Sequence, residues 1–264
     1  MANRNDISFT FIYATDIHLG HQIEGAIEEA KGDAFTAFEE ILQYSKNVHP
    51  DRAENADKID CLLLGGDLFH TPHPSMDDRL RTREMLAKYV LGDNEDGNDP
   101  TIDFRLISDP KVNFTDLPVN FENRDLNVTM PIISIFGNHD EPMSTGICVL
   151  QEFREYINLI GKRRYDLNLD SSVVHIYPVV LVKNGIKVAI YGLNYVRPES
   201  IESLQLKFHR AREVNRQTEN AEFIECFSIF MVHQDRFRDS IGLFNRALIP
   251  EWQGWPGKTR NLVY

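Results

Sequence analysis

The sequence has 264 residues, of which 42% are hydrophobic and 26% charged, so it is long enough for one large α/β domain or two small ones. Its formal net charge of -12 argues against a protein that coats DNA through general basicity. It does not exclude a nuclease, because metal-binding carboxylates add negative charge. The three cysteines are scattered, so we expect free thiols. The sequence has no signal-peptide core and no apolar run of membrane-spanning length, so we expect an intracellular, soluble protein with no membrane contact.

Hydrophobic periodicity predicts strands and helices that alternate along the chain. In chain order we expect a strand over Ile7–Ala14, a helix capped by Asp33, a strand over Ile59–Leu64, a helix over about Ser75–Leu91, a strand over Ile132–Phe136, a helix over about Thr145–Ile160, a hairpin of Val173–Val182 and Ile186–Tyr191 around Asn184-Gly185, and a strand over Phe227–Val232. This alternation predicts a two-layered α/β sandwich of mixed sheets with helices outside. The final stretch, from Pro250, has neither helical nor strand periodicity.

Polar side chains directly follow four of the predicted strands. They are Asp16 with His18, Asp67, Asn138 with His139, and His233. Ligands of α/β proteins bind at the carboxyl ends of strands, so neighbouring strands would bring these four groups together. Oxygen and imidazole ligands without thiolate suit Mn²⁺, Fe²⁺ or Zn²⁺ better than Ca²⁺.

Two such ions about 3.5–4 Å apart form the usual clamp for phosphoester hydrolysis, and the clamp requires a carboxylate that bridges both. Asp67 is the natural candidate for this bridge. Taken singly, an Asp-x-His triplet is common by chance, and Gly-Gly-Asp after a strand is often only a turn. Gly-Asn-His-Asp has no propensity reason to follow a buried strand, and the order of all four groups makes accident a poor explanation.

That order resembles the signature of the calcineurin-like metallophosphoesterases and, within them, of the eukaryotic Mre11 nuclease family. The segments that carry the resemblance are ATDIHLG (14–20), LLLGGDLFH (62–70), KYVLGD (88–93), ISDPKVNF (107–114), FGNHDEP (136–142), YGL (191–193) and VHQDR (232–236). The resemblance predicts a nuclease-type phosphoesterase domain over residues 1–240 and a tail over 241–264 outside the family pattern. Related protein phosphatases carry GDxVDRG and GNHE, which this sequence replaces with GGDLFH and GNHD, so that alternative is disfavoured.

Carried over by position, the resemblance implies metal ligands and a proton donor. The implied ligands are Asp16 and His18 for the first ion, Asp67 as the bridge, and Asn138 and His233 for the second ion. His139 would protonate or stabilise the leaving 3′-oxygen, and Asp140 is expected to orient its imidazole. His70 resembles a position that lines the substrate path, although a partly exposed loop histidine explains it equally well. We expect the other histidines to be solvated or locally hydrogen-bonded; they are His21, His49, His73, His175 and His209.

The resemblance implies an Mn²⁺-dependent 3′–5′ exonuclease and endonuclease of double-strand-break repair, located in the nucleus and acting on DNA with Rad50- and Nbs1-type partners. Two alternatives stay open: a non-catalytic scaffold that dimerises or binds DNA, and a phosphoesterase of small phosphoesters or phosphoproteins. Two basic clusters are candidates for salt-sensitive phosphate contacts, unless they are ordinary solvated helix faces. They are Arg79, Arg81, Arg83 and Lys88, and Lys162, Arg163 and Arg164.

The resemblance also implies a homodimer, formed through the helices predicted near Ser75–Leu91 and Thr145–Ile160. The apolar residues offered for this contact are Met76, Leu80, Ala87, Ile147, Leu150, Ile157 and Ile160. The alternative is that these residues face the domain's own core.

The sequence departs from the family pattern after His233. Mre11 proteins continue with another strand and a Gly-His-x-His motif that gives one histidine to each ion, whereas no histidine follows His233 here. The capping region and the Rad50-binding helices of the family are likewise absent from the 264 residues. We therefore expect a fragment, a spliced variant or a faulty gene model, with an incomplete metal site, an uncovered sheet edge, weak Mn²⁺ binding and little or no nuclease activity.

Overall fold

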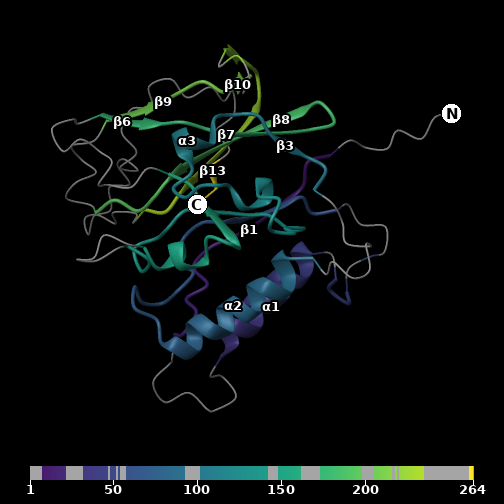
Figure 1. Cartoon of the computed structure of the whole chain (residues 1–264). Coiled ribbons are helices and arrows are strands. Elements are labelled where there is room, and N and C mark those ends of the chain that lie inside the picture. Colours follow the sequence, from purple (N-terminus) through teal and green to yellow (C-terminus); the bar gives the residue numbers. More distant parts are fainter. Residues whose placement is uncertain are drawn as a thin grey trace.

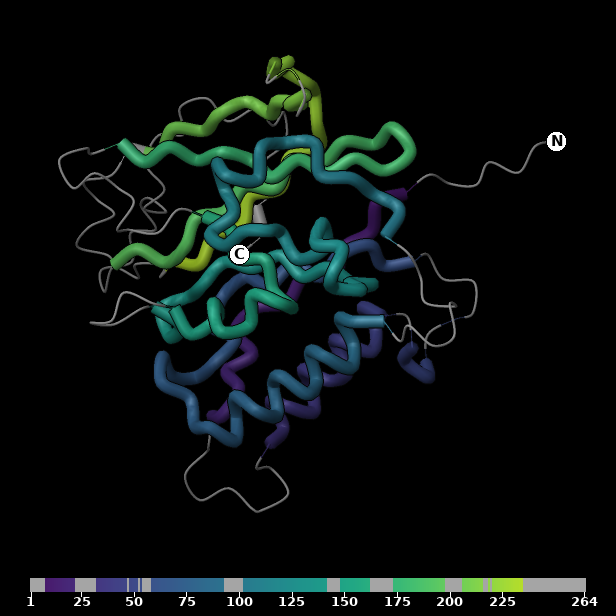
Figure 2. The backbone as a smooth tube through the Cα atoms, viewed as in Figure 1, coloured from purple at the N-terminus to yellow at the C-terminus, as the bar shows by residue number. Residues whose placement is uncertain are grey.

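The computed structural model describes residues 8–21, 32–46, 48–51, 53, 58–92, 102–141, 148–161, 173–197, 205–215, 218, 220–234 and 262–263. At its centre two β-sheets are stacked face to face, and two helices cover the outer side of one of them (Figure 1). The chain trace in Figure 2 shows the same layers, with the helices below and the later strands above. The predicted α/β sandwich is confirmed.

The first sheet is entirely parallel, in the order β1-β2-β4-β5. Its strands are β1 (Phe11–Ala14), β2 (Cys61–Leu64), β4 (Ile132–Ser134) and β5 (Ile157–Leu159). All four residues of β2 are buried, as the continuous apolar run predicts. Because the strands are parallel, the segments that follow β1, β2 and β4 all leave the sheet at one edge, where the predicted site residues lie.

The second sheet is mixed, in the order β13-β12-β8-β7-β3. Its strands are β3 (Arg105–Leu106), β7 (Val179–Lys183), β8 (Ile186–Leu193), β12 (Phe227–Val232) and β13 (Leu262–Val263). β7 and β8 form the predicted hairpin, in which Asn184 and Gly185 both have positive φ, at 48° and 87°. β12 runs parallel to β8, and this direction brings His233 to the same edge as the ends of the first sheet.

The edge of β12, which the sequence predicts to be uncovered, is paired in the structure. Phe230 and Met231 lie opposite Leu262 and Val263 of β13, which runs parallel to β12. A pair of residues is too short to produce a periodic signal, so the sequence gives no sign of this strand.

Alternation along the strands divides the core into two main layers. In β2, Leu62 and Leu64 contact the cluster that includes Phe38 and Leu86 of the helices. The intervening Leu63 faces the second sheet and belongs to the cluster between the two sheets. The helices are α1 (Asp33–Ser45) and α2 (Met76–Val90).

Helix α2 is confirmed close to its predicted bounds, and Ser75 caps it by accepting a hydrogen bond from the Asp78 N–H. The predicted cap of α1 is wrong by one residue. Asp33 is already helical, and Gly32 is the cap, with φ 101° and no side-chain hydrogen bond. Glycine adopts this left-handed conformation at little steric cost, so it can begin the helix without a side-chain acceptor.

Strands, not helices, cover the outer face of the second sheet in the described part of the chain. β6 (Val173–Ile176) and β9 (Gln205–Phe208) pair in parallel, and their apolar side chains pack on Tyr191 and Phe230. β10 (Arg212–Val214) and β11 (Ala221–Phe223) form a further ladder. Short helical segments complete the fold: α3 (Pro110–Asn113), η2 (Asn120–Glu122) and η3 (Val149–Phe153). None of the described helices is long and apolar enough to cross a membrane.

The predicted helix over Thr145–Ile160 is wrong. Residues 142–147 lie outside the described residues, and the rest of the segment is the short helix η3 followed by β5. Ile157 pairs with Ile132, and the buried Asn158 amide donates to the Ile132 carbonyl at 2.9 Å. Pairing with β4 therefore prevails over the helix-like spacing of the apolar residues.

Candidate metal centre at the carboxyl edge of the strands

Hydrogen bonds tie the segments that follow β1 and β2 to each other. The Asp16 N–H donates to the Gly66 carbonyl at 3.1 Å, and the His18 N–H donates to the Asp67 carbonyl at 3.0 Å. The two segments run side by side for several residues, so the side chains of one meet the side chains of the other. The sequence pattern Asp-x-His and the pattern Gly-Gly-Asp are thereby joined into one structural unit.

The predicted metal ligands have unusual backbone conformations. Asp16, His18 and Asp67 have φ angles of 55°, 53° and 53°, in the left-handed region that side chains other than glycine rarely adopt. Among the described non-glycine residues, only Asn184 in the hairpin turn shares this feature. Residues in such conformations cost of order 1–3 kcal/mol each and concentrate at functional sites.

Asp67, Asn138 and His233 bring together three atoms that each carry a lone pair. His233 Nε2 lies 3.0 Å from Asn138 Oδ1 and 3.3 Å from Asp67 Oδ2. Its other nitrogen, Nδ1, donates to the Gly65 carbonyl at 2.9 Å, so a neutral imidazole directs the Nε2 lone pair at the two oxygens. Such a cluster of electron-pair donors is stabilised by a cation.

Asp16, His18 and Asp67 form a second group of ligand atoms that all lie within 4.8 Å of one another. His18 Nε2 is 3.9 Å from Asp16 Oδ1 and 3.9 Å from Asp67 Oδ2. Ligands bonded at about 2.1 Å to one ion lie roughly 3–4.2 Å apart, so both groups fit a divalent metal. Asp67 Oδ2 faces both groups, as a bridging oxygen would. The structure thus brings together all five residues that the sequence singles out.

The protonation of Asp67 and His233 reflects their proximity. Asp67 is 2% exposed, and burial alone would raise its pKa, but the contact with His233, which donates a hydrogen bond from Nε2 when its ring is protonated, and the hydrogen bond from the His139 N–H lower it. Burial would lower the pKa of His233, but its contact with the Asp67 carboxylate raises it. The Asp67 carboxylate is therefore ionised near neutral pH, which is the form that binds metal.

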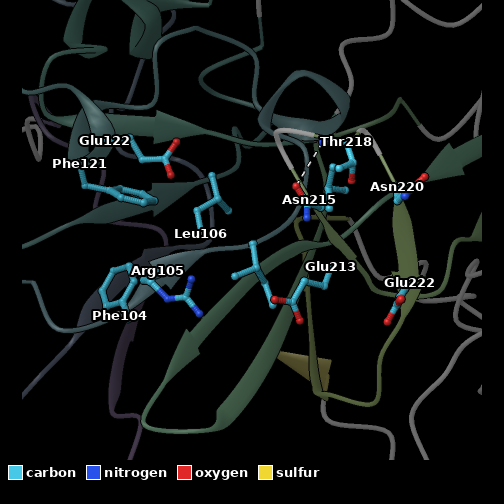
Figure 3. A pocket seen from close by; sticks show the side chains of 12 residues that line it. Phe104, Arg105, Leu106, Phe121, Glu122, Glu213, Asn215, Thr218, Asn220 and Glu222 are labelled. Carbon is cyan, nitrogen blue, oxygen red and sulfur yellow. Dashed lines mark hydrogen bonds between the residues drawn. The ribbon is translucent and has the colours of Figure 1, made fainter.

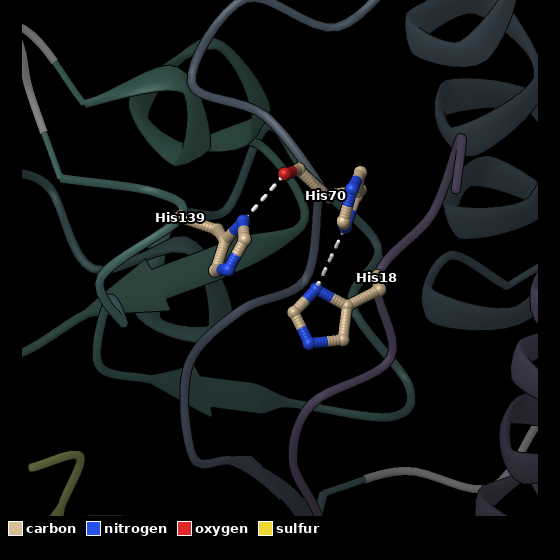
Figure 4. Close-up of side chains that lie close together, drawn as sticks. All are labelled: His18, His70 and His139. Atoms are coloured by element: carbon tan, nitrogen blue, oxygen red, sulfur yellow. Dashed lines mark hydrogen bonds between the residues drawn. The ribbon is translucent and has the colours of Figure 1, made fainter. Parts of the chain in front are cut away.

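His139 contacts the metal-ligand group through its backbone and leaves its ring outside that group. The His139 N–H donates to Asp67 Oδ1 at 2.8 Å and so holds the carboxylate in place. Its ring Nδ1 donates to the His70 carbonyl at 2.6 Å, which leaves Nε2 as the free ring nitrogen. Figure 4 shows the ring directed toward His18 and His70.

Asp140 does not contact the His139 ring, so the expectation that it orients this imidazole is wrong. The Asp140 carboxylate accepts backbone N–H bonds from Leu68, Phe69 and Gly137, each at 3.2 Å. It is fully buried, and burial raises its pKa to about 6 despite these bonds. Asp140 thus joins the segment after β4 to the segment after β2 and helps to hold the two segments together.

Gly137 is required where the segments after β2 and β4 meet. A Cβ on Gly137 would lie 2.1 Å from Asp67 Oδ1 and 2.7 Å from the Asp67 backbone nitrogen. We expect Gly137→Ala to displace the bridging carboxylate, with a loss of about 1–3 kcal/mol in the free energy of unfolding and weaker metal binding. Thermal unfolding and Mn²⁺ titration measure the two effects.

A suitable control is Gly185→Ala, where the added Cβ meets no atom within 4 Å but the φ of 87° makes it strained. This variant should lose stability and keep its metal affinity. Equal metal affinity in Gly137→Ala and the wild type would contradict the proposed packing at Asp67.

His70 and His21 lie closer to the centre than the sequence indicates. The His70 ring is 3.4 Å from His18 between their Nδ1 atoms, and the His21 ring centre is 4.1 Å from that of His70. His70 therefore belongs to the site, and His21, expected to be solvated or locally bonded, packs on it. The equal spacing of His18–His21 and Asp67–His70 is the signal that could have suggested this, because the two segments run in parallel.

The other histidines are local, as expected. His49 stacks on Tyr44 with ring centres 3.8 Å apart, and His73 lies in a turn closed by a bond to Thr71. His175 and His209 are hydrogen-bonded to each other at 2.7 Å on β6 and after β9.

The basic residues of α2 are engaged within the molecule. Arg79 pairs with Glu152 at 3.1 Å, and Lys88 pairs with Glu39 at 3.0 Å. The remaining contacts are Arg83 with Glu155 and Arg81 over the ring of Phe35. These pairings favour ordinary helix faces over phosphate contacts. The second predicted cluster, Lys162 to Arg164, lies outside the described residues.

A cavity of about 830 Å³ lies elsewhere, between β3 and the β10–β11 ladder (Figure 3). Its lining includes Arg105 and the carboxylates of Glu122, Glu213 and Glu222. None of the predicted site residues lines it, so the candidate metal centre is not this cavity.

The fold and the metal centre define a class of enzyme. Residues 9–254 match the calcineurin-like phosphoesterase family, and the chain belongs to that family. Its family activity is the hydrolysis of phosphoesters. The predicted domain boundary at residue 240 stays a prediction.

Within this class the chain is similar to double-strand break repair protein MRE11. It is 32% identical to the mouse protein over an alignment of 250 residues, which covers 92% of this chain and 31% of that protein. The human protein is 32% identical over 235 residues, covering 87% and 30% of the two chains. The protein of Oryza sativa subsp. japonica is 32% identical over 237 residues, covering 86% and 30%. These matches confirm the resemblance to Mre11, and the chain spans about 30% of the length of these relatives.

Proposed function

We propose that this chain is an Mn²⁺-dependent DNA nuclease of double-strand-break repair, with 3′–5′ exonuclease and endonuclease activity. The observation that carries the proposal is the convergence of electron-pair donors around Asp67 Oδ2, from His18 on one side and His233 on the other. The name of the similar proteins, double-strand break repair protein MRE11, extends the proposal from phosphoesters in general to DNA.

Each residue of the centre has a defined part in this proposal. Asp16, His18 and Asp67 would hold one ion, and Asp67, Asn138 and His233 would hold the other. When bound, the ions lower the pKa of a water molecule and stabilise the charge of the transition state. Carboxylate, amide and imidazole ligands are compatible with Mn²⁺.

Hydrogen bonds within the chain fix the orientation of these ligands. The His139 N–H holds Asp67 Oδ1, so Oδ2 is left to face both metal positions. The Gly65 carbonyl fixes the tautomer of His233 and directs its Nε2 at the second position. Preorganisation of this kind removes the cost of ordering the ligands when metal binds.

His139 is proposed to move a proton at Nε2. Its Nδ1 is held by the His70 carbonyl, so Nε2 is the nitrogen that can give a proton to the leaving 3′-oxygen. Because its ring is outside the group of metal ligands, His139 can act on the leaving group while the metal positions are filled.

The alternative is a non-catalytic scaffold that dimerises or binds DNA, in which the same centre does not cleave DNA.

A cleavage assay tests the proposal. The polypeptide is incubated with millimolar Mn²⁺ and either end-labelled DNA or an aryl phosphate. We expect DNA cleavage that requires Mn²⁺ and disappears with a chelator. Turnover of the aryl phosphate alone would overturn the assignment to DNA, and no turnover of either would leave the scaffold as the function.

We propose further that the chain forms a homodimer through α2. Met76 and Leu80 are 70% and 54% exposed and lie one turn apart on its surface. Three other predicted contact residues, Leu150, Ile157 and Ile160, are instead buried in the core, and Ile147 lies outside the described residues. Leu80→Glu should shift the sedimentation of the polypeptide from dimer to monomer, whereas Asp77→Asn should not. A wild-type monomer at micromolar concentration would contradict the dimer.

The Mre11 resemblance supports a nuclear location and Rad50- and Nbs1-type partners for the protein. We propose both for this chain, which spans about 30% of the length of its relatives. Co-purification from nuclear extracts with a tagged chain tests them.

A further inference from the structure

The rings of His18, His70 and His139 come from the segments after three different strands and face one another. Figure 4 shows them around a common space, with His139 on one side and His18 and His70 on the other. Their ring centres are 4.8 Å apart for His18 and His139, 5.1 Å for His70 and His139, and 5.3 Å for His18 and His70. One nitrogen from each ring lies within 4.8 Å of the other two.

We propose that these three imidazoles form a separate, inhibitory Zn²⁺ site, made of His18 Nδ1, His70 Nδ1 and His139 Nε2. The two Nδ1 atoms are 3.4 Å apart. Nitrogens bonded at about 2.0–2.1 Å to tetrahedral zinc lie roughly 3.3–3.4 Å apart, so this pair already has the required spacing. His139 supplies the third ligand through Nε2, because its Nδ1–H is used by the His70 carbonyl.

The ligand chemistry of this site differs from that of the neighbouring metal centre. It offers three imidazoles and no carboxylate, which favours Zn²⁺ over Mn²⁺, and the fourth tetrahedral position is open to water. The centre around Asp67 offers mainly oxygen ligands to its two ions. The three-imidazole site therefore prefers Zn²⁺ to Mn²⁺ more strongly than the Asp67 centre does, and the two sites share His18.

His18 makes the two sites mutually exclusive. A neutral imidazole has one lone pair, so its two nitrogens cannot both bind a metal without loss of the remaining proton. When Nε2 holds an ion of the nuclease centre, Nδ1 would keep the proton and donate it to His70 Nδ1, 3.4 Å away. When Zn²⁺ takes Nδ1, the proton moves to Nε2 and faces Asp16 Oδ1 and Asp67 Oδ2, each 3.9 Å away. No net proton is gained or lost.

The consequence for catalysis rests on the proposed function. Zn²⁺ at this site removes His18 from the first ion of the pair and occupies the nitrogen of His139 that would give its proton to the leaving group. Zn²⁺ therefore inhibits the Mn²⁺-dependent nuclease through two residues at once, and Mn²⁺ in turn weakens Zn²⁺ binding by competing for His18.

Zn²⁺ titration against a chromophoric chelator, with no other metal present, tests the site without any measurement of activity. We expect the tightest-bound Zn²⁺ to bind with an affinity at least 10-fold lower in His70→Asn, which removes one ligand. The control is His175→Asn, which removes one member of the other hydrogen-bonded histidine pair, His175 and His209. That variant should keep its affinity within about 3-fold.

Equal Zn²⁺ affinity in His70→Asn and the wild type would overturn the site. Loss of Zn²⁺ in His175→Asn instead would place the ion between β6 and β9 and would also overturn it. A Zn²⁺ site in a polypeptide that binds no Mn²⁺ would contradict the proposed function and leave this inference standing. If the polypeptide binds Mn²⁺ but His70→Asn binds Zn²⁺ as tightly as the wild type, the Zn²⁺ site is wrong and the proposed function stands.

Discussion

Replacement of Asp67 by Asn should abolish Mn²⁺ binding at both positions of the centre. Asp67 Oδ2 is the atom that faces both His18 and His233, at 3.9 Å and 3.3 Å. An amide of the same shape keeps the acceptor for the His139 N–H but removes the charge that holds two cations close together. We expect affinity to fall by more than about 100-fold, since a shared direct ligand matters more than a supporting residue. The electron paramagnetic resonance signal of free Mn²⁺ measures the bound fraction.

Two further results would support the interpretation of Asp67→Asn. The thermal midpoint without metal should change little, because asparagine keeps the acceptor for the His139 N–H and tolerates the left-handed backbone. Asp77→Asn, an exposed carboxylate in the first turn of α2, should bind as much Mn²⁺ as the wild type. If Asp67→Asn binds as much Mn²⁺ as this control, Asp67 is not the bridge.

Replacement of His139 by Gln should separate metal binding from catalysis. The backbone N–H of residue 139 continues to hold Asp67, and the ring is not among the residues proposed to bind Mn²⁺. Mn²⁺ binding should therefore persist, while DNA cleavage falls by about 10²–10⁴-fold, the contribution of a positioned proton donor. Cleavage rates at a Mn²⁺ concentration that saturates both proteins measure the effect.

The comparison for this variant is His49→Gln. The His49 ring stacks on Tyr44 and accepts a hydrogen bond from the Asp51 N–H, and it is not among the residues of the candidate centre. His49→Gln should cleave DNA at the wild-type rate. Loss of Mn²⁺ together with cleavage in His139→Gln would assign His139 to the metal ligands, and unchanged cleavage would remove it from the mechanism.

The centre could be predicted because parallel strands impose a simple geometry. Segments that follow β1, β2 and β4 must leave the sheet at one edge, so Asp16, Asp67 and Asn138 are brought together whatever the details of the loops. β12 adds His233 because it runs parallel to β8 in the facing sheet. The order of the motifs along the sequence therefore carried most of the information about the ligands.

The finer contacts depend on loop conformation, which periodicity does not describe. Asp140 follows His139 in sequence, yet the bend after β4 turns its carboxylate toward the backbone of Leu68 and Phe69. His21 reaches His70 only because the segments after β1 and β2 are hydrogen-bonded in parallel. Such contacts depend on the residues with left-handed backbone conformation at the strand ends. Neither the amino-acid composition nor the spacing of residues in the sequence reveals that conformation.

Tertiary pairing also overrode one local pattern. The apolar residues Leu150, Phe153, Ile157 and Ile160 have the spacing of a helix face. Ile157 and Leu159 are instead held in β5 beside β4, and all of the apolar residues are buried. Leu150, Ile157 and Ile160 are buried and therefore cannot form the predicted dimer surface. Met76 and Leu80 of α2 are the predicted dimer residues that stay exposed.

Crystals of the polypeptide soaked in millimolar Mn²⁺ would test the central claim most directly. Anomalous scattering locates each Mn²⁺ without reference to activity. We expect two peaks that share Asp67, one beside Asp16 and His18 and the other beside Asn138 and His233, about 3.5–4 Å apart as in other two-metal centres. Mn²⁺ bound elsewhere, or no Mn²⁺ at Asp67, would contradict the assignment of this site.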